Sequence, residues 1–252
     1  MATLYIVATP IGNLSDITIR ALEILRRVSV VYGEDTRVTR KLFERHGITT
    51  LLRSYHQHSS SQKVKEVIES LQHGDVALVT DAGTPGVADP GNELVAQLVW
   101  ANGRSPVLSE IKIVPIPGPS AVMAAASVCG FNMSAFTFLG YVPKKKGRQK
   151  FFRAIAESDI PVTLYETPHR IIRTLEELHG TIVEWVNSTQ PPLKVRGGEG
   201  GVMKYERRRL VVCRELTKIY ESIYRGTIEE VLAQVRRDPM RGEYVVIIDG
   251  NT

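Results

Sequence analysis

Short, uniformly apolar runs recur along the chain, and each is followed by a polar or glycine-rich loop. In the first half these runs cover residues 4–8, 28–33, 76–79 and 111–114. Uninterrupted apolar runs of this length are typical of strands that are covered on both faces of a sheet. The pattern therefore predicts a buried strand at each of these positions.

Between these runs, apolar residues return at helical spacing. Within residues 64–71 they follow the i, i+3, i+4, i+7 pattern, and Gly74 supplies a usual end for that helix. Ser15 is the expected cap of an earlier helix, and residues 94–99 predict a later one. Strands and helices thus alternate, which favours an α/β layered domain.

The second half repeats this alternation. Its expected strands cover residues 136–140, 161–165, 210–213 and 244–248. Its expected helices lie within residues 120–129, 151–155, 171–178 and 228–235. We therefore predict an α/β protein with two α/β domains, mixed sheets and a ligand cleft between the domains.

Three prolines within residues 115–119 interrupt regular structure and mark the expected domain boundary. The predicted domains are residues 1–117 and 118–252. Residues 189–209 show no periodicity and contain two prolines and several glycines, so we expect a mobile loop there.

Composition limits the class of protein. The 252 residues are 43% hydrophobic and 23% charged, as in soluble globular proteins, and contain no run suited to crossing a membrane. The first residues resemble a strand rather than a secretory signal, which favours a cytoplasmic protein without a membrane partner. The two cysteines, Cys129 and Cys213, are expected to be buried thiols.

The most informative loop covers residues 80–91, directly after the apolar run 76–79. Glycine permits positive φ and close backbone approach, while proline fixes φ, so their alternation makes a stiff loop. In open α/β sheets, ligands bind at the carboxyl ends of strands. Residues 80–91 are therefore the first candidate for a binding loop.

Several common chemistries lack their motifs. No P-loop, dinucleotide-binding glycine pattern or nucleophile elbow follows a strand. His56 and His58 could share an ion, but no third ligand lies nearby in the sequence, so no metal is expected. The residues alone predict a small-molecule site between two α/β domains and leave the reaction open.

A set of motifs in a fixed order then identifies a family. The motifs lie at residues 4–14, 34–37, 55–58, 81–91, 117–121, 165–170 and 214–218. Together they closely resemble the ribosomal RNA small-subunit 2′-O-ribose cytidine methyltransferases of the tetrapyrrole methylase superfamily. The resemblance runs from near residue 4 to near residue 249. It implies S-adenosylmethionine as cofactor, small-subunit ribosomal RNA as substrate and a homodimer.

The resemblance also implies which residues bind the cofactor in a cleft between the domains. By position, they are Pro10, Asp81, Ala82, Gly83, Val87, Ser120, Ala121, Glu166 and Leu216. Residues 189–209 form an apparent insertion relative to the family.

The transfer itself requires few groups. A ribose hydroxyl attacks the sulfonium methyl in line, and a base that accepts the hydroxyl proton adds about 10²- to 10⁴-fold in rate. Glu34 lies near an acidic catalytic position of related methylases, and Asp35 beside it is an equal choice. Either could instead form a structural ion pair with Arg37. Glu166 is a third candidate, with a structural role in binding loop amides as the alternative.

Basic residues are the expected contacts for RNA. The net charge is +5, and guanidinium and ammonium groups bind phosphate. The candidates are Arg37, His169, Arg170, Lys218, Lys144 and Lys145. His169 could instead cap its helix, and a basic cluster is also compatible with an ordinary solvated face.

The predicted function is S-adenosylmethionine-dependent methylation of a cytidine 2′-hydroxyl in small-subunit ribosomal RNA. Two alternatives stay open: methylation of a tetrapyrrole carbon, as in the wider superfamily, and a non-catalytic role in RNA binding or ribosome assembly.

Overall fold

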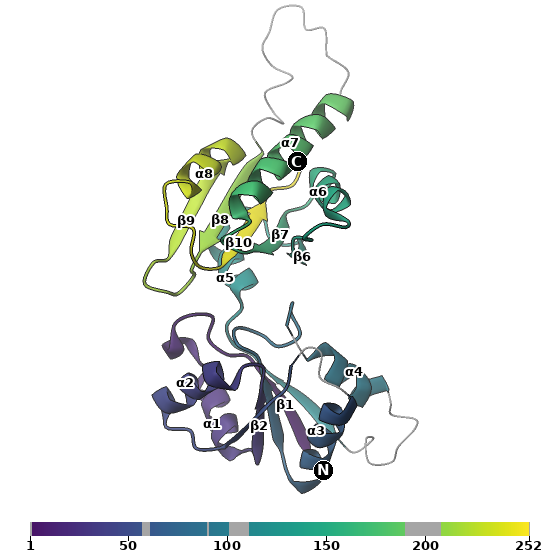
Figure 1. The fold of residues 1–252 in the computed structure, drawn as a ribbon, viewed down its shortest axis with the longest axis vertical. Coiled ribbons are helices and arrows are strands. Elements are labelled where there is room, and N and C mark those ends of the chain that lie inside the picture. Colours follow the sequence, from purple (N-terminus) through teal and green to yellow (C-terminus); the bar gives the residue numbers. More distant parts are fainter. Residues whose placement is uncertain (1, 57–60, 90, 101–110, 190–207, 252) are drawn as a thin grey trace, which may run out of the picture. The chain divides into compact units, whose positions relative to one another are not determined.

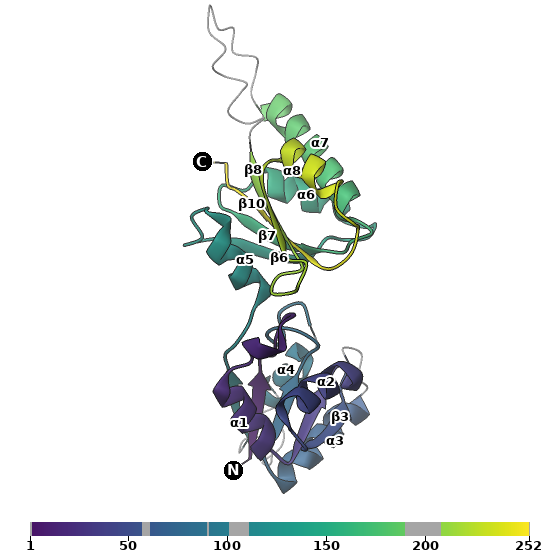
Figure 2. The same ribbon diagram turned by 90° about the vertical axis from the view of Figure 1, so that its left-hand side faces the viewer.

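The structure is a computed structural model that describes residues 2–56, 61–89, 91–100, 111–189 and 208–251. It forms two compact units, unit 1 (Met1–Ser120) and unit 2 (Ala121–Thr252). Figures 1 and 2 label their helices and strands. The unit boundary lies in the same proline-containing connection as the boundary predicted at residue 117.

Unit 1 contains a five-stranded sheet in the order β3-β2-β4-β1-β5. Every strand pair in this order is parallel. The strands are β1 (Thr3–Val7), β2 (Val30–Gly33), β3 (Leu51–Ser54), β4 (Val76–Val79) and β5 (Lys112–Ile116). Parallel strands require crossover connections, and helices supply them here.

Two helices cover each face of this sheet. Helices α1 (Ile19–Arg27) and α2 (Thr36–His46) contribute to the core on one face, and α3 (Ser61–His73) and α4 (Asn92–Trp100) to the core on the other. Successive residues of β2 and β4 therefore alternate between the two cores, and all of them are buried. This double cover explains why the strands are uniformly apolar in sequence.

The first helix begins later than predicted. The Asn13 side chain accepts the Ser15 N–H and starts a 3₁₀ turn, η1 (Leu14–Asp16). Thr18 then caps α1 by accepting the Ala21 N–H at 3.2 Å. The prediction that Ser15 caps this helix is wrong because a competing Asn cap lies two residues earlier.

Pro115 was expected to break regular structure, yet β5 continues through it to Ile116. β5 is an edge strand that pairs with β1 only, and Pro115 lies opposite Ile6. A proline without an N–H is compatible with an edge position, where one side of the strand makes no sheet bonds.

Unit 2 contains the mixed sheet, in the order β6-β7-β10-β8-β9. Its strands are β6 (Thr137–Tyr141), β7 (Val162–Glu166), β8 (Arg209–Arg214), β9 (Ser222–Thr227) and β10 (Tyr244–Ile248). The β6/β7 pair is parallel and the other pairs are antiparallel. Edge strand β9, like β3 and α2 in unit 1, was not predicted from the sequence.

The helices of unit 2 divide unequally between the two faces. Helices α6 (Arg148–Ala156), α7 (Ile171–Thr189) and α8 (Ile228–Val235) form the larger core on one face, whereas α5 (Ala121–Cys129) packs on the other (Figure 2). Both cysteines are buried in the smaller core, as predicted. Among the described residues, no helix is both long and apolar enough to span a bilayer.

Arg208 shows that a basic run in sequence need not be a basic surface. Its guanidinium is buried and donates to the carbonyl oxygens of Ala156, Ser158 and Asp249 at 2.8–3.1 Å. Burial lowers the pKa of Arg208 to about 10. The arginine therefore anchors the start of β8 at one end of the predicted 189–209 loop, most of which lies outside the described residues.

Candidate active site

The candidate site of unit 1 lies at the carboxyl ends of adjacent strands β1 and β4. β1 leads through α1, on one face of the sheet, to β2 on one side. β4 leads through α4, on the other face, to β5 on the opposite side. Adjacent strands whose connections diverge in this way open a crevice, where ligands bind in open α/β sheets. Thr9 and Pro10 follow β1, and Thr80 and Asp81 follow β4.

The two loops at this point are joined by hydrogen bonds. Thr9 and Gly83 exchange two backbone bonds of 2.9 and 3.0 Å, and the Thr9 hydroxyl donates to the Thr80 carbonyl at 3.1 Å. Gly83 has a φ of 78°, which few other residues adopt without strain. The prediction that glycine gives this loop its shape is confirmed at Gly83, and the loop is fixed against β1.

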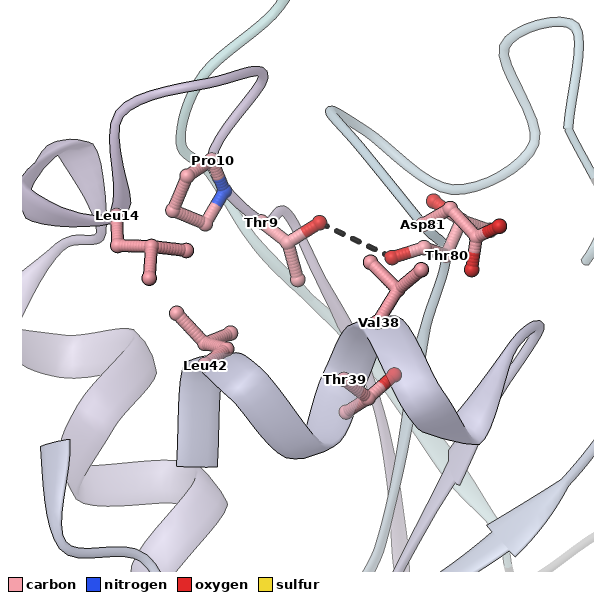
Figure 3. A pocket seen from close by; sticks show the side chains of 8 residues that line it. All are labelled: Thr9, Pro10, Leu14, Val38, Thr39, Leu42, Thr80 and Asp81. Atoms are coloured by element: carbon pink, nitrogen blue, oxygen red, sulfur yellow. Dashed lines mark hydrogen bonds between the residues drawn. The ribbon is translucent and has the colours of Figure 1, made fainter. Parts of the chain in front are cut away.

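A hollow of about 30 Å³ lies beside these loops (Figure 3). Pro10 and Leu14 line one side, and Val38 and Leu42 of α2 line the opposite side. Thr80 also lines the hollow, and its buried Oγ1 has no hydrogen-bond partner among the described residues. Buried hydroxyls are usually paired, so this atom is available to a ligand or a water molecule.

Glu34 and Asp81 place two carboxylates side by side, at the ends of neighbouring strands β2 and β4. Burial raises the pKa of Glu34, the negative charge of Asp81 raises it further, and a hydrogen bond with the Asp81 backbone opposes both. Asp81 is exposed, and its Oδ1 accepts the Asp35 N–H at 2.8 Å. The structure thus brings together predicted residues from two motifs that lie far apart in sequence.

Asp35 faces the other way in function. Its carboxylate caps α2 by accepting the Arg37 N–H at 2.8 Å, and it pairs with the Arg37 guanidinium at 2.6 Å. These contacts hold the pKa of Asp35 at about 2. The structural ion pair considered for this motif therefore forms through Asp35 and leaves Glu34 outside it.

His56 is a site residue that the sequence presented only as a possible metal ligand. It follows β3, next to β2, and its charge acts on both Glu34 and Asp35. Its position after a strand of the parallel sheet is the signal that could have identified it. The parts of the chain that the structure describes hold no cluster of three metal-binding side chains, and His58 lies outside them.

In unit 2, Glu166 ends β7 and is buried. Its Oε1 accepts the Thr167 N–H at 2.7 Å and pairs with Arg170 at 2.6 Å, while its Oε2 accepts the Thr174 hydroxyl at 2.7 Å. These contacts match the structural role considered for Glu166. Its predicted catalytic and cofactor roles stay predictions.

The other predicted residues occupy varied surroundings. Ala82 is half-buried and Val87 is exposed in the 80–91 loop, while Ser120 and Ala121 lie where the two units join. In unit 2, Leu216 packs beside the α5 core. No structural feature described here tests their predicted roles in cofactor binding.

The predicted RNA contacts differ in how much of their charge is already paired. Lys218 pairs with Glu215 and Glu243, and Arg170 with Glu166. The side chain of Arg37 is 87% exposed, although Asp35 holds its guanidinium. The remaining three, His169, Lys144 and Lys145, are exposed. The exposed lysines are therefore better placed for phosphate than the paired residues.

Comparison with known proteins decides the family. Residues 3–232 match the profile of the tetrapyrrole (corrin/porphyrin) methylases. The chain belongs to this methylase family. The match confirms the superfamily that the motifs indicated and the two-sheet α/β fold.

Among curated relatives of this methylase, three are named ribosomal RNA small subunit methyltransferase I. The one from Synechocystis sp. is 39% identical over 100% of this chain and 80% of its own length. The one from Thermotoga maritima is 34% identical over 99% of both chains, and the one from Escherichia coli O157:H7 is 38% identical over 98% of this chain and 78% of its own.

Solved structures agree on the fold of the methylase. A cobalt precorrin-4 methyltransferase covers 98% of this chain with a TM-score of 0.66 and 16% identity, the match spanning 94% of that chain. A diphthine synthase covers 99% with a TM-score of 0.67 and 15% identity, spanning 90% of that chain. At this low identity, the similarity establishes the fold alone.

Proposed function

We propose that this methylase transfers a methyl group from S-adenosylmethionine to the 2′-hydroxyl of a cytidine in small-subunit ribosomal RNA. The observation that carries the proposal is the 34–40% identity, over nearly the whole chain, to proteins named as small-subunit ribosomal RNA methyltransferases. The paired loops at the ends of β1 and β4 supply a site where such chemistry can occur.

The residues at this site fit the cofactor. S-adenosylmethionine carries a positive sulfonium whose methyl group is transferred, and the exposed carboxylate of Asp81 attracts such a charge. The unpaired Thr80 hydroxyl and the fixed backbone of the 80–91 loop provide hydrogen-bonding groups beside it. The predicted cofactor residues Pro10, Asp81 and Gly83 lie together there.

Glu34 is the proposed base. A carboxylate must be ionised to accept the proton of the ribose hydroxyl, and a raised pKa makes it a stronger acceptor while it stays ionised near neutral pH. Asp35 is a poorer choice because its ion pair with Arg37 stabilises the carboxylate against protonation. Glu34 accepts the proton, and the surrounding loops hold the hydroxyl in line with the methyl group.

A transfer assay separates this proposal from the two alternatives. The protein is incubated with labelled S-adenosylmethionine and either small ribosomal subunits or a porphyrin precursor. We expect label in the ribosomal RNA, at a ribose 2′-hydroxyl of cytidine. Label in the porphyrin precursor, or tight cofactor binding with no transfer to either acceptor, would contradict the proposal.

Replacing Asp81 by Asn tests the cofactor site. The amide keeps an oxygen that can accept the Asp35 N–H but removes the charge, so we expect S-adenosylmethionine affinity to fall by about fivefold. S-adenosylhomocysteine, a neutral thioether, serves as the matched ligand and should lose little affinity. Calorimetric titration of both ligands without RNA measures this difference, and equal losses would argue against a role for Asp81 charge.

The resemblance also supports a homodimer, and the proposed substrate supports a cytoplasmic location, where bacterial ribosomal subunits assemble. Sedimentation equilibrium of the purified protein measures the first directly. A single species with the mass of one chain would contradict the dimer.

A further inference from the structure

An aromatic cluster in unit 2 has no role in the site described above. The Phe138 and Tyr165 rings meet edge to face with centroids 4.9 Å apart, and the Tyr141 ring lies tilted against Tyr165 at 5.4 Å. Phe138 and Tyr141 belong to edge strand β6, and Tyr165 belongs to the adjacent parallel strand β7. Tyr141 is 46% exposed, so this supported ring faces solvent at the end of its strand.

The backbone just after Tyr141 is firmly held. Arg170 donates to the Val142 carbonyl at 2.9 Å, and Arg148 donates to the Pro143 carbonyl at 3.0 Å. Arg148 is itself buried and bonded to Thr174 at 2.9 Å. Two guanidinium groups thus fix the segment that follows the ring, which leaves little conformational entropy to lose when a ligand binds.

Exposed positive charge follows this segment. Lys144, Lys145 and Lys146 come directly after Pro143, and all three are exposed. The neighbouring carboxylates are already paired, Glu166 with Arg170 and Glu177 with Arg148 and Arg173. The lysine charge is therefore available to an anion in solution.

We propose that Tyr141 is a stacking platform for an unpaired base of the RNA substrate, with Lys144 and Lys145 binding the adjacent phosphates. This inference rests on the proposed function and adds a substrate contact to it. Proteins that bind single-stranded RNA combine such aromatic rings with basic grooves, because stacking holds bases and lysine holds phosphates. A protein partner fits less well, since lysine is depleted at protein interfaces.

The test compares two oligomers that carry equal charge. One is an oligocytidylate of about 12 nucleotides, and the other is a ribose-phosphate oligomer of the same length without bases. We expect the wild-type protein to bind the oligocytidylate about 5- to 100-fold more tightly. Tyr141→Ala should reduce this ratio to near one, whereas Tyr141→Phe, which keeps the ring, should preserve it.

Two matched controls separate stacking from charge. Tyr220→Ala removes another exposed tyrosine of unit 2 and should leave the ratio unchanged. Lys144→Gln with Lys145→Gln should weaken both oligomers alike and reduce the salt dependence by a slope of about 0.7 per lost phosphate contact. Tyr141→Ala should leave that slope unchanged.

An unchanged ratio in Tyr141→Ala would overturn the inference. So would equal weakening of both oligomers together with dissociation of a dimer in sedimentation, which would make Tyr141 part of an interface between copies of the chain. Methylation of small subunits by the wild-type protein is measured alongside. If methylation occurs and the ratio is near one, this inference fails alone; if no transfer to ribosomal RNA occurs, the proposed function fails whatever the ratio.

Discussion

Glu34→Gln should lower the rate of methyl transfer by about 10²- to 10⁴-fold, because the amide cannot accept the proton of the attacking hydroxyl. Glutamine has the size and the hydrogen-bonding capacity of glutamate, so the fold and the cofactor affinity should change little. Single-turnover rates at saturating S-adenosylmethionine and RNA measure the chemical step separately from binding.

The pH dependence gives a second readout of the same residue. Glu34 acts as a carboxylate, so the wild-type rate should fall as the pH drops through its raised pKa. In Glu34→Gln this acid limb should disappear. In Asp81→Asn it should move to lower pH, because the negative charge that raises the Glu34 pKa has been removed.

Asp35→Asn is the matched control for Glu34→Gln. Asparagine is also a good helix cap, and the carboxylate that it replaces is occupied by Arg37. We expect a rate close to wild type. A large rate loss in Asp35→Asn combined with full activity in Glu34→Gln would assign the base to Asp35 instead.

Glu166→Ala should destabilise the protein by about 3 kcal/mol, the second large effect expected. The change removes the partner of Arg170 and leaves the Thr174 hydroxyl and the Thr167 N–H without their acceptor. The Arg170 side chain is 23% exposed, which lets water compensate in part and places the cost at the low end for a broken buried pair. Urea unfolding of the full chain measures the loss.

Glu166→Gln distinguishes a structural role from a catalytic one. Glutamine keeps one acceptor oxygen and gains a donor, so the contacts with Thr167 and Thr174 can largely persist. We expect a smaller loss of stability and a methyl-transfer rate near wild type at temperatures where the variant is folded. A stable Glu166→Gln variant with a strongly reduced rate would restore the catalytic role predicted from sequence.

The sequence by itself determined the class of fold, the family and the loops that carry the site. The apolar runs at residues 4–8 and 76–79 are legible because a strand covered on both faces must be apolar throughout. The short strands β3 and β9 escaped prediction because they lie at sheet edges, where solvent relaxes the apolar pattern. The early cap at Asn13 was missed because Ser15 is an equally good cap by composition.

Only the tertiary structure decided which charges are available. Glu34 and Asp35 are neighbours in sequence, yet Asp35 binds Arg37 while Glu34 lies beside Asp81 from a strand more than forty residues away. Arg208 belongs to a basic run but is buried, whereas Lys144 and Lys145 are exposed. The physical reason is that a charge is neutralised by whatever lies within a few ångströms in space, and strand order, which sequence patterns leave open, determines those neighbours.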